Sequence, residues 1–195
     1  MGAPGIVRDV SAVPEPDSQQ KRHGLSRRVV LVPGVLALLP EYAGRTDPVA
    51  ELREACVAAV SWLTGPVEIV ADAQGRRVAE HLLAVSSGST GSTDAGGTSY
   101  LVVANGSACR SEKAPGHLDE RSFGFDEEVD KALRTPDRAA LSGLDEALGA
   151  ELWAGNVSGL RRLGELLAGA GAAVVDYADD PFGVQYWVMR WECAS

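Results

Sequence analysis

The residues best suited to chemistry lie in one segment directly after an apolar run. Residues 101–104 read Leu-Val-Val-Ala, and the polar turn Asn105, Gly106 and Ser107 follows at once. Ligands of open α/β sheets bind beyond the carboxyl ends of strands, so this turn is the first candidate site. Its backbone amides could bind an anion, although the same residue types also form ordinary turns.

Four candidate site residues follow this turn: Cys109, Lys113, His117 and Asp126. A Cys109 thiolate would be a nucleophile, and His117 could carry a proton near neutral pH. Lys113 could contact an anionic ligand, while Asp126 could point a carboxylate into a cleft or interact with the helix dipole from a first turn. The structural alternatives are a small buried Cys109 and solvated loop residues. The catalytic candidates are Cys109 and His117, and the ligand-binding candidates are Asn105, Gly106, Ser107, Lys113 and Asp126.

Strands that alternate with helices must position this segment. Apolar runs predict strands at residues 29–32, 67–70 and 99–104. A helix that Asp47 caps and Pro48 begins, with its apolar face running to Leu63, is predicted between the first two strands. A shorter helix over residues 74–85 precedes the third strand.

The second half of the chain adds helices and then returns to strands. The helix predicted after the third strand has Phe125, Val129 and Leu133 on one face. Thr135 and Pro136 begin a second predicted helix, whose apolar face is Leu141, Leu144 and Leu148. Asn156 caps a third, whose apolar face is Leu160, Leu163 and Leu167. Strands are predicted at residues 172–177 and 184–191, and the Pro-to-Gly turn between them favours an antiparallel pair. Trp187 and Trp191 lie on one face of the last strand, and we expect both in the core. We therefore predict an α/β fold of three layers: a helix-flanked, mostly parallel sheet with an antiparallel C-terminal strand.

Length and charge indicate a single domain that does not bind nucleic acid. The 195 residues suit one domain, predicted over residues 27–195, after a flexible tail at residues 1–26 that lacks apolar periodicity. The net charge of −9 argues against a nucleic-acid partner, which needs a basic face. No apolar run is long enough to span a membrane, so no membrane partner is expected.

The cysteines indicate the compartment. Cys56, Cys109 and Cys193 are odd in number and widely spaced, which predicts neither a disulfide framework nor a metal site and favours the cytoplasm. The alternative is a twin-arginine export signal, since Ser26, Arg27 and Arg28 precede an apolar run. A buried first strand explains the same run without export.

Three motifs resemble the class III extradiol ring-cleavage dioxygenase subunit-B-like family, in particular a short actinobacterial branch of it. They are VPGVLALLPEYAG at residues 32–44, NGSACRSEKAPG at residues 105–116 with Phe125 and Asp126 after it, and DPFGVQYWV at residues 180–188. The likeness spans about residues 29–191, and the middle motif is the most specific.

The resemblance implies a ferrous iron held by two histidines and a carboxylate, and this chain departs from that set. The opening motif's histidine aligns with Gly34, and the turn where catalytic relatives place Ser-His reads Ser107, Ala108 and Cys109. Glu192 stands near the end of the chain as a possible carboxylate ligand. We expect a domain without a cofactor that binds a small molecule or a protein partner through residues 105–125. The alternative is an extradiol-type dioxygenase using Fe(II), or a cysteine-dependent enzyme, with replaced catalytic residues.

Overall fold

The computed structural model describes residues 2, 27–42, 47–86 and 97–193, so the predicted tail at residues 1–26 lies almost entirely outside the described residues. The strands are β1 (Arg27–Val32), β2 (Val67–Val70), β3 (Ser99–Val103), β4 (Val174–Asp179) and β5 (Tyr186–Cys193). The α-helices are α1 (Ala50–Ser61), α2 (Ala73–Ser86), α3 (Arg121–Arg134), α4 (Arg138–Ser142), α5 (Glu146–Glu151) and α6 (Val157–Leu166). Short 3₁₀ turns follow β1 at Leu36–Leu38 (η1) and Pro40–Tyr42 (η2), and Pro181–Gly183 (η4) joins β4 to β5.

The five strands form one sheet in the order β2-β3-β1-β5-β4. β2, β3 and β1 are parallel, with Val30 opposite Leu101 at the centre. β5 runs antiparallel to β1, and β4 runs antiparallel to β5. The sheet is therefore parallel in its first half and antiparallel at the C-terminal strands, which confirms the predicted fold class.

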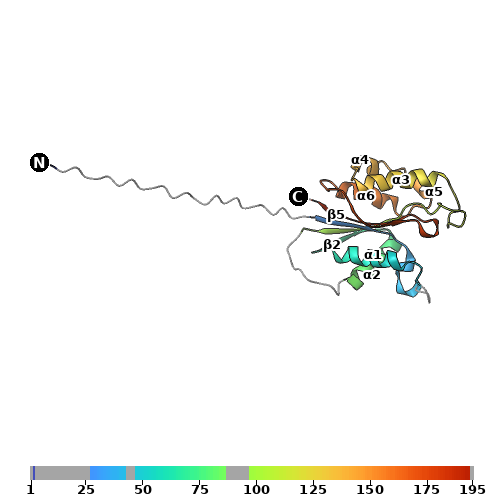
Figure 1. Ribbon diagram of the computed structural model, residues 1–195, viewed down its shortest axis with the longest axis horizontal. Helices are drawn as coiled ribbons and strands as arrows, with labels where there is room; N and C mark the ends of the chain where they lie inside the picture. Colours follow the sequence, from blue (N-terminus) through green and yellow to red (C-terminus); the bar gives the residue numbers. More distant parts are fainter. Residues whose placement is uncertain (1, 3–26, 43–46, 87–96, 194–195) are drawn as a thin grey trace.

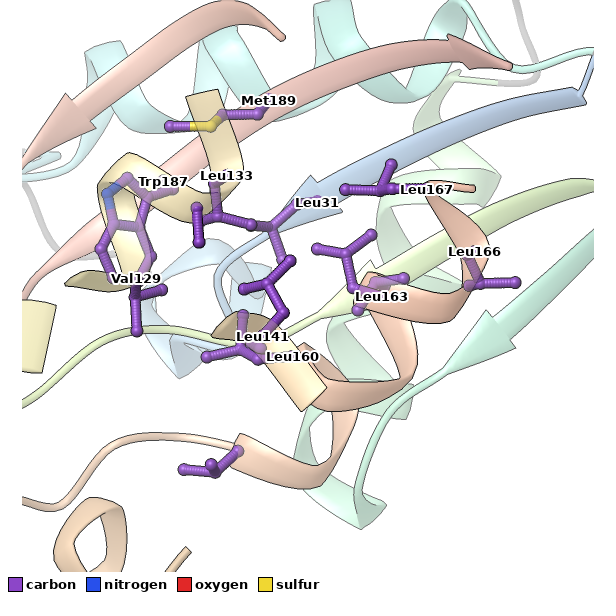
Figure 2. Packing of buried hydrophobic residues seen from close by; sticks show 14 of the residues in the cluster. Leu31, Val129, Leu133, Leu141, Leu160, Leu163, Leu166, Leu167, Trp187 and Met189 are labelled. Atoms are coloured by element: carbon purple, nitrogen blue, oxygen red, sulfur yellow. The ribbon is translucent and has the colours of Figure 1, made fainter. Parts of the chain in front are cut away.

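Helices cover both faces of this sheet (Figure 1). Alternate residues of β1 point to opposite faces because side chains alternate along a strand. Val29 and Leu31 pack with the helices α3, α4 and α6, while Val30 and Val32 pack with α1 and α2. Figure 2 shows the first of these two cores, in which Leu31 lies beside Leu133, Leu160 and Leu163. The result is the three-layer arrangement that the sequence predicts.

Trp187 and Trp191 are fully buried in that core, as predicted. The indole nitrogen of Trp187 donates to Asp130 at 3.0 Å, and that of Trp191 donates to the carbonyl of Leu133 at 3.2 Å. Burial of the large rings is possible because each indole N–H has an acceptor. Both rings thus fix α3 against the last strand.

Two predicted helix boundaries are wrong. The helix predicted from Thr135 through Leu148 is two helices, because α4 begins after the cap Asp137 and ends at Gly143, and Asp145 then caps α5. Asp47 does not cap α1, which begins at Ala50; its carboxylate accepts instead from the backbone of Val49 at 3.1 Å and from Arg53. Asp137 and Asp145 therefore set the starts of α4 and α5, whereas no side chain caps α1.

Asn156 caps α6 as predicted, since its side chain accepts from the backbone N–H of Gly159. The predicted strands at residues 172–177 and 184–191 begin and end two residues later than expected, as β4 and β5. No helix in the described part of the chain is long and apolar enough to cross a membrane.

Candidate functional site

The helices that follow β1 and β3 lie on opposite faces of the sheet. The segment after β1 leads to helices on one face, whereas the segment after β3 leads to helices on the other, although the two strands are neighbours. A crevice opens at such a point in α/β sheets, beyond the carboxyl ends of the strands, and ligands commonly bind there. Gly34 follows β1 and Asn105 follows β3, so the predicted turn does lie at this position.

Polar groups of the chain bond to one another at this position. The backbone N–H of Gly34 donates to Oδ1 of Asn105 at 3.4 Å, and its carbonyl accepts from Nε2 of Gln74 at 2.8 Å. Asn105 also forms a two-way backbone bridge with Gly155, at 3.1 Å in each direction. Asn105 therefore connects the ends of β1 and β3 to the loop before α6.

Asp126 is the centre of a buried polar cluster at the same end of the sheet. Its side chain is 2% exposed, and it accepts from the backbone N–H of Ser107 at 2.8 Å and from the Ser107 hydroxyl at 2.6 Å. Nη1 of Arg110 donates to the same carboxylate at 3.1 Å, while Nε of Arg110 donates to Asp180 at 2.6 Å. Burial raises the pKa of Asp126, and the bonds from Ser107 and Arg110 oppose that rise.

These contacts correct one expectation about Asp126. Because α3 begins at Arg121, the aspartate lies beyond the first helical turn, and no acidic residue occupies that turn. Its carboxylate points neither at the dipole nor into an open cleft; it holds the turn at Ser107 against α3. The structure brings four of the predicted residues together: Ser107 bonds to Asp126, Gly106 packs against it, and Asn105 precedes them in the same turn.

The turn is fixed on both sides by backbone hydrogen bonds. Gly106 donates to the carbonyl of Gln185 at 2.9 Å, and Gln185 donates to the carbonyl of Ser107 at 2.9 Å. On the other side Ala108 donates to the carbonyl of Leu152, also at 2.9 Å. The loop is thus clamped between the β4–β5 connection and the end of α5.

The other predicted residues lie apart from this cluster. Lys113 and His117 are exposed, and His117 has a left-handed backbone with φ of 60°. Cys109 is buried, with its Sγ 3.4 Å from the carbonyl of Leu152. Burial, and next the negative charges of Asp119 and Asp126, raise the pKa of the Cys109 thiol. The thiol form therefore predominates at neutral pH.

Exposed apolar side chains lie on the loops next to residues 111–117. Trp153 is 59% exposed and Phe182 is 60% exposed, and both have left-handed backbones. Gly116 lies against the Trp153 ring, and Gly183 lies against Ser111 and Ala114, so the two aromatic residues flank residues 111–117. Phe123 lies 4.8 Å from the guanidinium of Arg110. We call the exposed surface of Lys113, His117, Leu118, Phe123, Trp153 and Phe182 the loop surface.

Gly34 and Glu192, which the resemblance places at ligand positions, lie at different places in the fold. A Cβ at Gly34 would lie 3.2 Å from Cγ1 of Val103, so the position is closely packed. Glu192 of β5 lies opposite Arg28 in the register of the sheet, at the far end of β1 from Gly34. At the rise of a strand, the six residues from Arg28 to Gly34 span roughly 20 Å. Among the described residues, no group of three or more His, Cys, Asp and Glu side chains could hold a metal ion. The donor set of a two-histidine, one-carboxylate site is not assembled from these positions.

Sequence reasoning missed Arg110 and Asp180 as members of the buried cluster. Arg110 lies 16 positions before Asp126 and 70 before Asp180, so no local pattern connects them. Their only signal was that both stand inside motifs that carry the family resemblance, NGSACRSEKAPG and DPFGVQYWV. No protein-family model matches the chain, and no curated protein matches it.

Proposed function

We propose that this chain is a binding domain built on an extradiol-dioxygenase-like scaffold, and that it works without iron. Its ligand is a small molecule or a protein partner that contacts the loop surface, and we place the protein in the cytoplasm. The observation that carries the proposal is the bonding of Asp126: the carboxylate accepts three hydrogen bonds from Ser107 and Arg110 inside the protein. A carboxylate held in this way supports the loop between β3 and α3.

The loop surface supports recognition of an apolar or aromatic group. The rings of Phe123, Trp153 and Phe182 are exposed. The backbone near them is held by the buried cluster at Asp126 and by the backbone hydrogen bonds of the turn to Gln185 and Leu152. Rigid aromatic side chains give a large contact area at a small entropic cost, and for that reason they are enriched at binding sites. Lys113 and His117 add polar contacts beside them.

The cysteine-dependent alternative would require a thiolate at Cys109. The structure buries this side chain, and the neighbouring carboxylates raise the pKa of the thiol further. Both effects reduce the fraction of the nucleophilic form at neutral pH. We therefore assign Cys109 a packing role.

Anaerobic titration with ferrous iron, followed by desalting and metal analysis, tests the absence of an iron site. We expect no stoichiometric iron to remain, and no ring cleavage when catechol and oxygen are added. His117→Ala and Glu192→Gln are the matched variants, and both should behave like the parent. One tightly held iron per chain that either substitution removes would overturn the proposal.

Fragment binding followed by amide NMR tests the loop surface directly. We expect weakly binding aromatic fragments to shift the amide signals of Leu118, Phe123 and Trp153, and the double substitution Trp153→Ala and Phe182→Ala to remove those shifts. Tyr42→Ala is the control, because Tyr42 is also an exposed aromatic residue but lies in η2 after β1. Shifts that survive the double substitution would contradict binding at this surface.

A further inference from the structure

The helices α3, α4 and α5 lie in the layer on one face of the sheet (Figure 1). Residues of these helices and of the turns between them line a cavity on this layer. Its volume is about 830 Å³. Sites for small molecules commonly have volumes of about 300 to 1,000 Å³, so this cavity has the size of a small-molecule site.

Small residues create the hollow, because their side chains leave the space between the helices open. Its lining includes Gly124, Ala132, Ala139, Ala140 and Gly143. Three larger apolar side chains form another part of the wall, namely Phe125, Leu144 and Leu148. Phe125 is only 6% exposed and belongs to the core below, so the wall is anchored in the packed interior.

The cavity lies on the other side of α3 from the cluster at Asp126. Gly124, Glu128, Lys131 and Thr135 follow the three- and four-residue spacing of a single helical face, and all four line the cavity. Asp126 points away from this face, toward Ser107. A ligand in the cavity therefore would not touch the loop surface.

The charged lining of the cavity is predominantly negative. Glu128, Asp137 and Asp145 stand against a single cation, Lys131. Asp137 and Asp145 cap α4 and α5 by accepting from backbone N–H groups, which leaves their negative charge in place. In the described part of the chain, Glu128 has no ion-pair partner within 4 Å.

From this combination we infer a binding site for a small amphipathic organic cation, with an apolar body against Phe125, Leu144 and Leu148 and an ammonium group near Glu128. The apolar wall supplies burial, and the excess of carboxylates supplies charge complementarity. The site goes beyond the proposed function, because it is separate from the loop surface and needs nothing from it.

Amide NMR of the full chain, titrated with 1-naphthylmethylamine, tests this site. The matched probe is 1-naphthylacetate, which has the same ring system and the opposite charge. We expect the amine to shift the signals of Gly124, Ala140 and Gly143 in a saturable way. The acetate should bind at least fivefold more weakly.

Two substitutions at one position separate cavity filling from any change in folding. A Cβ at Gly124 would meet no atom within 4 Å, so Gly124→Ala can be accommodated, and both Gly124→Ala and Gly124→Leu should favour the helix over glycine. Only the leucine side chain projects far enough to occupy the hollow. We expect Gly124→Leu to abolish binding of the amine and Gly124→Ala to preserve it.

Glu128→Gln tests the charge separately from the shape. We expect it to weaken binding of the amine about threefold, as for loss of one exposed charge pair, and to leave unfolding unchanged. Equal binding of both probes, shifts confined to the loop surface, or an unchanged affinity in Gly124→Leu would each overturn the inference. If a basic peptide shifts the signals of the cavity residues and the amine does not, the cavity binds a macromolecular partner, and the inference is overturned as well.

Discussion

Gly106 is the residue on which the packing of the candidate site depends most closely. A Cβ at this position would lie 2.5 Å from Oδ1 of Asp126 and 2.8 Å from the ring of Trp187. Both neighbours are buried and bonded, so neither can move away easily. The turn itself would have to shift, and its backbone hydrogen bond to Gln185 would lengthen.

We expect Gly106→Ala to lower the free energy of unfolding by about 2 kcal/mol or more, in the range for overpacking a filled interior. Urea unfolding gives the measurement. Gly171→Ala is the control, because no atom lies within 4 Å of the added Cβ, and its effect should stay within about 0.5 kcal/mol. Equal effects of the two substitutions would show that the turn is not packed as described.

At the scale of single elements, Asn156 determines how α6 begins. Its backbone is left-handed, with φ of 57° and ψ of 55°. Its Oδ1 accepts from the backbone N–H of Gly159 at 3.1 Å, and its Nδ2 donates to the carbonyl of Val103 at 2.8 Å. One amide side chain thus joins the end of β3 to the start of the helix that buries Leu160 and Leu163.

We expect Asn156→Ala to destabilise the fold by about 2 kcal/mol or more, because it removes the cap and places a Cβ residue without a local hydrogen bond in the left-handed region. Asn156→Gly loses the same bonds but tolerates the backbone, so its loss should be smaller. Thermal and urea unfolding of the two variants give the order. An alanine variant as stable as the glycine variant would argue against backbone strain at this position.

The elements show which features a sequence can and cannot predict. The strands around Val30 and Leu101 and the caps at Asn156 were predictable, because periodicity and capping depend on residues close in sequence. The break at Gly143 was not predicted, because the leucines continue at helical spacing on both sides of it. The link from Arg110 to Asp180 was beyond local patterns too, since only the folded sheet brings β4 and β5 next to the turn.

The candidate site was also predictable in its position but not in its hydrogen bonds. The position of the turn after β3 follows from the general rule for α/β sheets, and the structure places Asn105 at the crossover beside Gly34. What the turn does with its polar groups depends on distant partners. Asp126 was predicted to face a ligand or the dipole, and the structure shows it bonded to Ser107 and Arg110.

At the scale of the whole molecule, the two cores share one sheet. Val29 and Leu31 belong to one core, and Val30 and Val32 belong to the other, so β1 cannot leave the sheet without opening both. The helices of the two faces therefore depend on the same strands. A single cooperative unit over residues 27–195 remains a prediction that unfolding can test.

We expect one transition for the whole described fold, seen at the same urea concentration from both faces. Trp62 packs against the α1 and α2 core, and Trp187 and Trp191 lie in the core of α3, α4 and α6, so the protein carries a natural reporter on each side. Labelling with 5-fluorotryptophan and fluorine NMR gives separate signals, assigned by Trp62→Phe and Trp153→Phe variants. The two variants leave the signals of Trp187 and Trp191 as one remaining pair, and both of these rings lie in the same core. Native signals of Trp62 and of this pair that disappear at the same midpoint support a single unit. Loss of the Trp62 signal at a clearly lower urea concentration would mean that α1 and α2 unfold before the rest, and that the sheet does not couple the two cores.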